Sequence, residues 1–295
     1  MPRTPRGRLT LAEEQPRSRR HRWTVRVVIG ALVAVVGVAA YAGGRGLVDS
    51  VGAQRCQATA LKTSVTFDPE QMSNAATITA IAQRRGLPAR AATIALATAI
   101  TESKLRNLTY GDRDSLGLFQ QRPSQGWGTA DQILDPEHAT NAFYDALVKI
   151  KDYQTKDITA VAQAVQRSAF PEAYAAHEQE GRILASVLAG YSPGGLGCRL
   201  AASPHAADGP TVRSLLTAEL GVTSTLRGTT LVVTADSTRQ AWAVGAWAVA
   251  KATDTGIRGV TVGSRMWTRS TGRAGWSWAT ADRPQAATTV VIHLA

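Results

Sequence analysis

Residues 91–103 read Ala-Ala-Thr-Ile-Ala-Leu-Ala-Thr-Ala-Ile-Thr-Glu-Ser, a run of Ala, Ile, Leu and Thr that ends in a carboxylate, Glu102. Apolar residues surround the helix that this run predicts instead of forming one stripe, which is typical of a helix buried within a domain. Glu102 leaves this helix on the face of Ala95 and Ala99. A carboxyl group on a buried face keeps its proton more readily than one in water and can then act as a general acid. An exposed salt bridge from Glu102 to Arg106 is the alternative.

A second motif lies around Gln120, 18 residues after Glu102, where residues 115–123 read Ser-Leu-Gly-Leu-Phe-Gln-Gln-Arg-Pro. In the catalytic domain of lytic transglycosylases and related lysozyme-like muramidases, a Glu-Ser pair at a helix end is followed at this separation by Gly-Leu-Met-Gln and soon by Pro. The chain resembles that family in both motifs, with Phe where the family has Met. The residues that carry the resemblance are Glu102, Ser103, Gly117, Leu118, Phe119, Gln120 and Pro123.

The resemblance covers residues 74–191 and implies the activity of that family, with residues 164–168, then Pro171 and Tyr174, as the loose counterpart of its later Tyr-Asn-Ala-Gly signature. The family cleaves peptidoglycan between N-acetylmuramic acid and N-acetylglucosamine, so the resemblance implies that Glu102 protonates the bridging oxygen. In lytic transglycosylases the same Glu then removes a proton from the muramic C6 hydroxyl, which leaves a 1,6-anhydro end and requires no second carboxylate. The expected substrate contacts are Ser103, Gln120, Trp127, Gln166 and Tyr174.

Some of the candidate side chains have structural alternatives. Trp127, which lies between two glycines, could stack on a sugar ring or fill a gap in the core, and Tyr174 could be a core residue. Asp112 and Asp114 are the nearest candidates for the second carboxylate that a hydrolase would need. However, Asp in a Gly-containing turn often bonds its own backbone, and Asp114 could cap the segment that begins at Ser115.

The sequence predicts no metal or nucleotide cofactor and no nucleic-acid partner. The five histidines lack zinc-ligand spacing, the Asp112–Asp114 pair supplies too few oxygens for calcium, and no Gly-rich phosphate loop is present. The net charge of +11 is concentrated near the N-terminus, because residues 1–42 hold eight Lys or Arg against two Asp or Glu and leave only +5 for the rest.

The N-terminal region predicts an exported protein that is anchored in a bacterial cell membrane. Residues 1–22 are rich in Arg and Pro and predict a disordered cytoplasmic tail. Residues 23–44 contain an uncharged apolar run close to the roughly 20 residues that a membrane helix needs, and the positive side of such a helix stays cytoplasmic. One alternative is secretion after cleavage near Ala42, because Ala40-Tyr41-Ala42 has the small-x-small pattern of a cleavage site. A buried core helix is the other.

The only two cysteines, Cys56 and Cys198, bracket the region of the resemblance. In an exported chain such a pair is more often a disulfide than two free thiols, and a metal site would need further ligands nearby. A bridge across a loop of this length could stabilise the fold by roughly 4–5 kcal/mol in the chain-entropy model. We therefore predict a Cys56–Cys198 disulfide.

The domain organisation follows from helical patterns and from shifts in composition. We predict an extracytoplasmic linker and domain entry over residues 45–73, a mainly α, lysozyme-like domain over 74–191, a Pro- and Gly-rich linker over 192–210, and a small α/β or α+β domain over 211–295. The predicted helices are 74–85, 89–105, 136–153, 158–169, 171–188, 212–219 and 238–253, and the predicted strands are 229–234, 259–262 and 288–292.

The C-terminal region holds five of the seven tryptophans, interleaved with arginines. They could form a cationic, aromatic surface for anionic wall polymers, for a glycan or for a protein partner. Alternatively, they fill a core that aliphatic residues alone would not close. The residues are Trp242, Trp247, Trp267, Trp276 and Trp278, with Arg265, Arg269 and Arg273.

Two functions of different classes remain open. The first is a peptidoglycan-cleaving enzyme, a lytic transglycosylase or muramidase-type glycosidase with Glu102 as acid and base. The second is a non-catalytic wall-binding or scaffold protein that keeps a lysozyme-like groove. An Arg106–Glu102 pair would favour the second function, because it would hold that carboxyl ionised and unable to act as an acid. Cleft geometry discriminates between the two, because an intact groove over Glu102 indicates turnover.

Overall fold

The described part of the chain begins at β1 (Arg55–Ala60), which lies at the centre of a three-stranded sheet. It pairs antiparallel with β2 (Thr63–Phe67) along one edge and with β3 (Leu196–Arg199) along the other. Cys56 faces Cys198 across β1 and β3, and their sulfur atoms are bonded to each other. The predicted disulfide is therefore confirmed.

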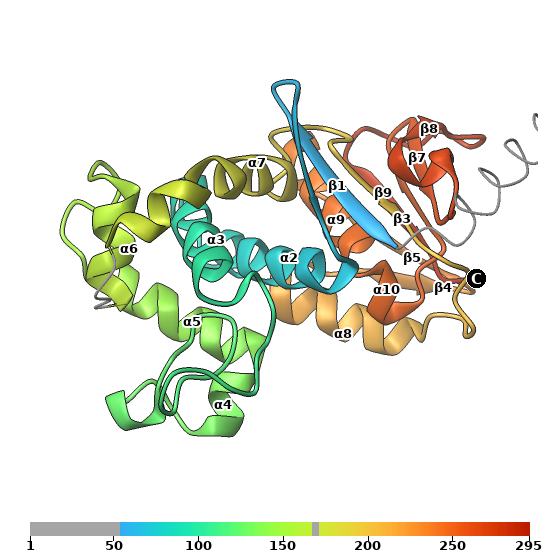
Figure 1. Ribbon diagram of the computed structural model, residues 1–295. Helices are drawn as coiled ribbons and strands as arrows, with labels where there is room; N and C mark the ends of the chain where they lie inside the picture. Colours follow the sequence, from blue (N-terminus) through green and yellow to red (C-terminus); the bar gives the residue numbers. More distant parts are fainter. Residues whose placement is uncertain (1–53, 167–170) are drawn as a thin grey trace, which may run out of the picture. The chain divides into compact units, whose positions relative to one another are not determined.

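The computed structural model describes residues 54–166 and 171–295, which belong to one compact unit (Figure 1). These residues have a mixed α/β fold with nine helices and two antiparallel sheets. The predicted tail, residues 1–22, and the predicted membrane anchor, residues 23–44, lie outside the described residues. Within the described ranges, no helix has both the length and the apolar character that crossing a membrane requires.

Two consecutive helices, α2 (Pro69–Arg84) and α3 (Ala89–Ser103), form the middle of the helical region (Figure 1). Asp68 is the N-cap of α2 and forms a capping box, and proline occupies the first turn, where its missing N–H costs nothing. Every residue of α3 from Ala91 to Ile100 is buried. The prediction of a helix buried on all sides is confirmed.

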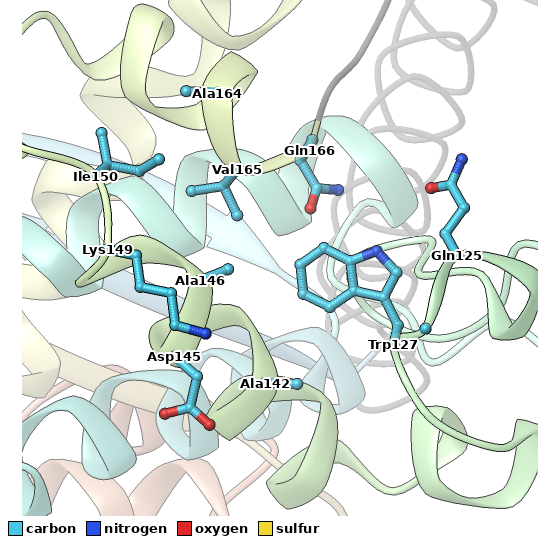
Figure 2. Close-up of a pocket in the computed structure, with 11 residues that line it drawn as sticks. Gln125, Trp127, Ala142, Asp145, Ala146, Lys149, Ile150, Ala164, Val165 and Gln166 are labelled. Atoms are coloured by element: carbon cyan, nitrogen blue, oxygen red, sulfur yellow. The ribbon is translucent and has the colours of Figure 1, made fainter.

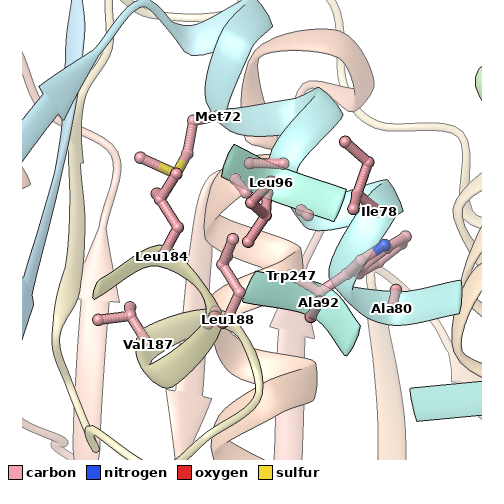
Figure 3. Packing of buried hydrophobic residues seen from close by; sticks show 14 of the residues in the cluster. Met72, Ile78, Ala80, Ala92, Leu96, Leu184, Val187, Leu188 and Trp247 are labelled. Carbon is pink, nitrogen blue, oxygen red and sulfur yellow. The ribbon is translucent and has the colours of Figure 1, made fainter. Parts of the chain in front are cut away.

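The packing of α7 (Glu178–Leu188) against α3 depends on a glycine. A Cβ atom at Gly181 would lie 2.8 Å from the carbonyl oxygen of Thr93, closer than carbon and oxygen atoms tolerate, so only glycine allows the two backbones to approach this closely. Leu184 of α7 then packs beside Leu96 of α3 in a shared apolar cluster (Figure 3).

The other helices of this region differ from the prediction mainly in length. Their bounds are η1 (Pro123–Gln125), α4 (Ala130–Leu134), α5 (Pro136–Leu147), α6 (Ile158–Gln166) and η2 (Pro171–His177). The predicted helix 136–153 ends early as α5, because Val148 is exposed and Asp152 has a left-handed φ of 61°. The predicted helix 171–188 is divided into the 3-10 helix η2 and α7.

The C-terminal region contains a six-stranded antiparallel sheet in the order β4-β5-β9-β6-β7-β8. The strands are β4 (Thr225–Arg227), β5 (Thr230–Thr234), β6 (Gly259–Val262), β7 (Arg265–Thr268), β8 (Ala279–Thr280) and β9 (Thr289–His293), and the helices are α8 (Gly209–Leu220), α9 (Thr238–Ala250), α10 (Ala252–Thr255) and η3 (Arg273–Trp276). Trp247, Trp267 and Trp278 are buried, as the core alternative predicts, whereas Trp242 and Trp276 are half-buried.

The helical region and the C-terminal region pack directly on each other, because α2 also contacts α8 and α9 (Figure 1). Trp247 of α9 lies in the same apolar cluster as residues of α2 and α3 (Figure 3). A buried ion pair lies at this junction, with Lys251 Nζ 2.9 Å from Glu219 Oε1. Lys251 also donates to the Thr77 hydroxyl of α2 at 2.6 Å, and Trp247 Nε1 donates to Glu219 Oε2 at 2.6 Å.

Candidate active site

Glu102 lies in the last turn of α3, one residue before the helix ends. Lys104 then adopts a left-handed conformation, with φ 54° and ψ 39°, where glycine is usual. The N–H groups of Lys104 and Leu105 donate to the carbonyl oxygens of Ile100 and Ala99, at 2.9 Å and 3.0 Å. Left-handed residues other than glycine are uncommon and often occur at functional sites. The chain therefore turns sharply away directly after Glu102.

Ser103 ties the end of α3 to the loop that carries Gln120. Its side chain is only 5% exposed, and its hydroxyl lies 2.7 Å from the carbonyl oxygen of Leu118 and 3.0 Å from that of Ala99. A hydroxyl has one proton, so the two carbonyls share this donor. Ser103 is not among the residues that line the neighbouring pocket. Ser103, which the sequence analysis predicts as a substrate contact, therefore positions the loop against the end of α3.

The loop itself is closed by a pair of main-chain hydrogen bonds between Leu116 and Gln121, at 2.9 Å and 3.0 Å. Gly117 has a left-handed φ of 75°, and a Cβ atom there would lie 2.6 Å from the carbonyl oxygen of Ile133. Only glycine meets both conditions. Gln120 also has a positive φ, 47°. The Nε2 of its side chain donates to the Gly117 carbonyl oxygen at 3.3 Å. The loop thus presents Gln120 in a fixed, strained conformation.

Tyr174 forms a side-chain hydrogen bond with Glu102. The phenol of Tyr174 donates to Glu102 Oε1 at 2.7 Å. Tyr174 is 1% exposed and belongs to η2, which packs against α3, whereas Glu102 is half-buried. A buried donor of this kind fixes the orientation of the carboxyl group and occupies one of its two oxygens. The other oxygen is then available to a ligand.

A pocket of about 280 Å³ lies in front of Glu102 and brings most of the predicted residues together. Gln166 projects from the end of α6 and donates to the Phe119 carbonyl oxygen at 2.6 Å. Gln121 is buried and donates to the Ala139 carbonyl oxygen at 3.1 Å. The lining is mostly polar, which suits a hydroxylated ligand. The lining residues are Glu102, Asp112, Ser115, Gln120, Gln121, Arg122, Gln125, Trp127 and Gln166.

The two candidate second carboxylates occupy different positions. Asp112 lines the pocket but its side chain is 91% exposed, with Arg113 Nε 3.9 Å away. Asp114 accepts the Ser124 N–H at 2.8 Å and the Arg122 Nε–H at 2.7 Å. These two hydrogen bonds to the ionised form, the one from Ser124 first, hold the pKa of Asp114 well below its usual range. Asp114 therefore acts as an anchor for the loop, and it does not line the pocket.

Arg106 does not pair with Glu102. Its guanidinium forms ion pairs with Glu70, at 2.7 Å, and with Asp68, the N-cap of α2, which also pairs with Arg55 of β1. The exposed Glu102–Arg106 salt bridge that the helical spacing offered as an alternative is thus not formed. An ion pair between Arg106 and Glu102 would have favoured a non-catalytic role for Glu102.

A second hollow, of about 440 Å³ (Figure 2), shares part of its wall with the first. Gln125, Trp127 and Gln166 line both. Because these residues line both, the two hollows are neighbours. Trp127 is half-buried and packs against the core on its other side, which combines both roles that its sequence context allows.

Motif spacing predicted Glu102 and Gln120, and the loose counterpart of the family's later signature predicted Gln166, but the sequence analysis missed the polar residues that complete the pocket. Ser115, Gln121, Arg122 and Gln125 also line it, and the only signal for them was their position next to Gln120. Among the residues that the structure describes, no three His, Cys, Asp or Glu side chains lie close enough to hold a metal ion. Comparison with models of known protein families and with curated proteins finds no match for this chain.

Proposed function

We propose that this chain is a membrane-anchored, exported enzyme that cleaves the glycosidic bond between N-acetylmuramic acid and N-acetylglucosamine in peptidoglycan, as a lytic transglycosylase. The hydrogen bond from the buried Tyr174 phenol to Glu102 carries the proposal. It holds the Glu102 carboxyl group in one orientation at the wall of a polar pocket. The resemblance in the Glu-Ser and Gly-Leu-Phe-Gln motifs supports it, and so does the Cys56–Cys198 disulfide, which fits an exported protein.

In the proposed reaction, protonated Glu102 donates its proton to the bridging oxygen as the bond to the muramic C1 breaks. The muramic C6 hydroxyl then attacks C1 and gives its proton to the Glu102 carboxylate. The carboxyl group is thereby restored, no water is consumed, and the product has a 1,6-anhydro end. Gln120, Gln166 and Trp127 are placed to hold the sugar rings by hydrogen bonds and by stacking.

The environments of the two candidate second carboxylates, Asp112 and Asp114, favour a transglycosylase over a hydrolase. Hydrolysis needs a base for water or a carboxylate nucleophile across the bond from the acid. Among the candidates that the sequence offered, Asp114 is tied to the Arg122 and Ser124 of its own loop, and Asp112 extends into solvent. An Arg106–Glu102 pair would have favoured the non-catalytic alternative, and Arg106 is engaged with Glu70 and Asp68 instead.

The test is digestion of purified peptidoglycan by the full chain in detergent, with the released fragments analysed by mass spectrometry. Glu102→Gln keeps the shape of the side chain but cannot cycle a proton, so we expect turnover to fall by about 100-fold or more. Glu137→Gln, on α5 and away from the pocket, is the matched control and should act like the wild type. Anhydro ends lost only in Glu102→Gln support the proposal. Reducing ends would indicate a hydrolase, and no release of fragments would overturn the enzymatic function.

A further inference from the structure

The edge strands of the two sheets, β2, β3, β4 and β8, differ in how they are protected from pairing with another chain. η3 packs against β3, where a Cβ atom at Gly197 would lie 2.3 Å from the Trp276 carbonyl oxygen. β4 has only three residues and includes Arg227, and β8 has only two. Covering elements, charges and short length are the usual protections of a sheet edge. β2 has five residues, Thr-Ser-Val-Thr-Phe, without charge or proline, and β1 is the only described strand that pairs with it (Figure 1).

The backbone of β2 presents hydrogen-bonding groups to this open edge. In an antiparallel sheet, successive residues of a strand bond alternately to the neighbours on either side. Thr59 of β1 bonds to the side of β3, because its N–H donates to the Gly195 carbonyl oxygen at 2.8 Å. Its register partner in β2, Ser64, therefore directs its own N–H and C=O groups away from β1, and Thr66 does the same. Both Ser64 and Thr66 are exposed.

The pattern of these outward groups matches itself under a two-fold rotation. If the β2 strands of two copies run antiparallel about Val65, Ser64 of each copy lies opposite Thr66 of the other, and each can donate to and accept from its partner. Val65 then lies opposite Val65 of the second copy, and Thr63 lies opposite Phe67. Hydroxyl pairs and pairs of β-branched or aromatic side chains are favourable across strands. Because β2 carries no charge, the pairing brings no like charges together.

We propose that β2 pairs with the β2 of a second copy of this chain, which joins their three-stranded sheets into one continuous sheet. Two such short strands form an interface below the roughly 1,200 Å² of a stable complex, so the pairing depends on a high local concentration. Only residues 45–53 separate the predicted membrane anchor, residues 23–44, from Gln54, where the described chain begins beside β1. Copies anchored in one membrane therefore hold these strands near each other. That step rests on the proposed anchor, whereas the strand register does not.

The test is disulfide cross-linking of variants of the full chain, each with one added cysteine, in phospholipid vesicles under mild oxidation. Val65→Cys should form covalent dimers, because residues directly opposite in an antiparallel pair lie within disulfide reach, as Cys56 and Cys198 do in this chain. Ser64→Cys is the matched control. Its two copies would lie diagonally, about 7–8 Å apart, so we expect at least about fivefold fewer dimers. An equal mixture of Ser64→Cys and Thr66→Cys should form heterodimers.

Thr66→Pro, added to Val65→Cys, removes an outward N–H group and leaves the bonds to β1, so it should lower the dimer fraction by about fivefold. The urea midpoint checks its folding, and the three cysteine variants decide the matter if it is unfolded. Equal cross-linking of Val65→Cys and Ser64→Cys would indicate random collision and overturn the inference. Cross-linking of neither would also overturn it, in favour of another occupant of the edge.

Flotation of the vesicles separates this inference from the proposed anchor. A chain that stays in the soluble fraction would contradict the anchor, and the same cysteine variants are then oxidised at high protein concentration in solution. The same order, with Val65→Cys and the mixture far above Ser64→Cys, would support the pairing without the anchor. Equal cross-linking there would overturn the pairing as well. Cleavage of peptidoglycan is not part of the readout, so the result does not depend on the proposed activity.

Discussion

At the scale of single residues, the Tyr174–Glu102 hydrogen bond should set how well the carboxyl group is aimed. Tyr174→Phe keeps the buried ring and removes only the hydroxyl that lies 2.7 Å from Glu102 Oε1. We expect kcat for peptidoglycan fragments to fall by about tenfold with little change in KM, because orientation of the acid matters mainly in the transition state. Stability should change by only about 1 kcal/mol, since the half-buried Glu102 regains water.

The matched control for this position is Tyr153→Phe, which removes a hydroxyl from another buried tyrosine that lies outside the pocket. Its kcat should equal that of the wild type. An unchanged kcat in Tyr174→Phe would show that the hydrogen bond has no role in turnover. An equal rise in KM would indicate that Tyr174 contacts substrate instead of positioning Glu102.

Residue roles could be predicted from the sequence only where spacing alone fixes them. The distance between two motifs predicted Glu102 and Gln120 as site residues, and both line one pocket. The roles of Ser103 and Asp114 depend on which carbonyl or amide each side chain meets after folding. Those partners lie on a loop whose conformation depends on residues with left-handed φ. The helical pattern of the sequence does not predict that conformation. Arg106 shows the same limit, because its partners come from a different helix.

At the scale of elements, the disulfide should stabilise the pairing of β1 with β3. Its two cysteines are 142 residues apart and fully buried. The Cys56→Ala/Cys198→Ala double variant should lose roughly 5 kcal/mol of stability in the chain-entropy model, measured as a lower midpoint in urea. Because the sulfur atoms are inaccessible, reductant should not break the disulfide of the folded wild type. Once the wild type has been unfolded in reductant, its urea midpoint should equal that of the double variant. Equal midpoints without reductant would contradict this expectation.

Helices and strands differed in how well the sequence predicted them. The sequence predicted α3, α8, α9 and most of α2, because helix-forming residues and helix-ending signals lie within each segment itself. β1, β2 and β3 were missed, and β3 falls in the segment predicted as a linker. A strand is stable only when its partner is present, and the whole helical region separates β1 from β3 in the sequence.

At the scale of the whole molecule, the sequence did not indicate how the C-terminal region packs on the helical region. The segment over 192–210 contributes β3 to the first sheet. The backbone of its Arg199 also forms an isolated β-bridge with Ser270, which follows β7 of the second sheet. Trp247 reaches the core beside α2 (Figure 3). The composition of residues 192–210 predicted a boundary between two domains. The sequence could not predict how the two regions pack, because that packing depends on surfaces that form only when each region has folded.

The buried Lys251–Glu219 pair at this junction gives a test of whether the two regions unfold together. The side chains are 7% and 5% exposed, so Lys251→Met would leave the Glu219 carboxylate buried without its cation. Loss of one partner of such a pair typically costs about 3–5 kcal/mol. The Lys251→Met/Glu219→Leu double variant removes both charges and should recover most of that loss. Removing the Arg182–Glu178 pair on the surface of α7 is the control and should cost about 1 kcal/mol or less.

Differential scanning calorimetry reads the result. Because Lys251 and Trp247 of the C-terminal region meet Thr77 of α2 through this network, we expect a single transition whose midpoint falls in Lys251→Met. If the regions were energetically independent, two transitions would be seen, and only the one from the C-terminal region would move. Two transitions would mean that the shared core is a contact between separately stable units. One transition would mean that a loss of stability in the C-terminal region also destabilises α3, which orients Glu102.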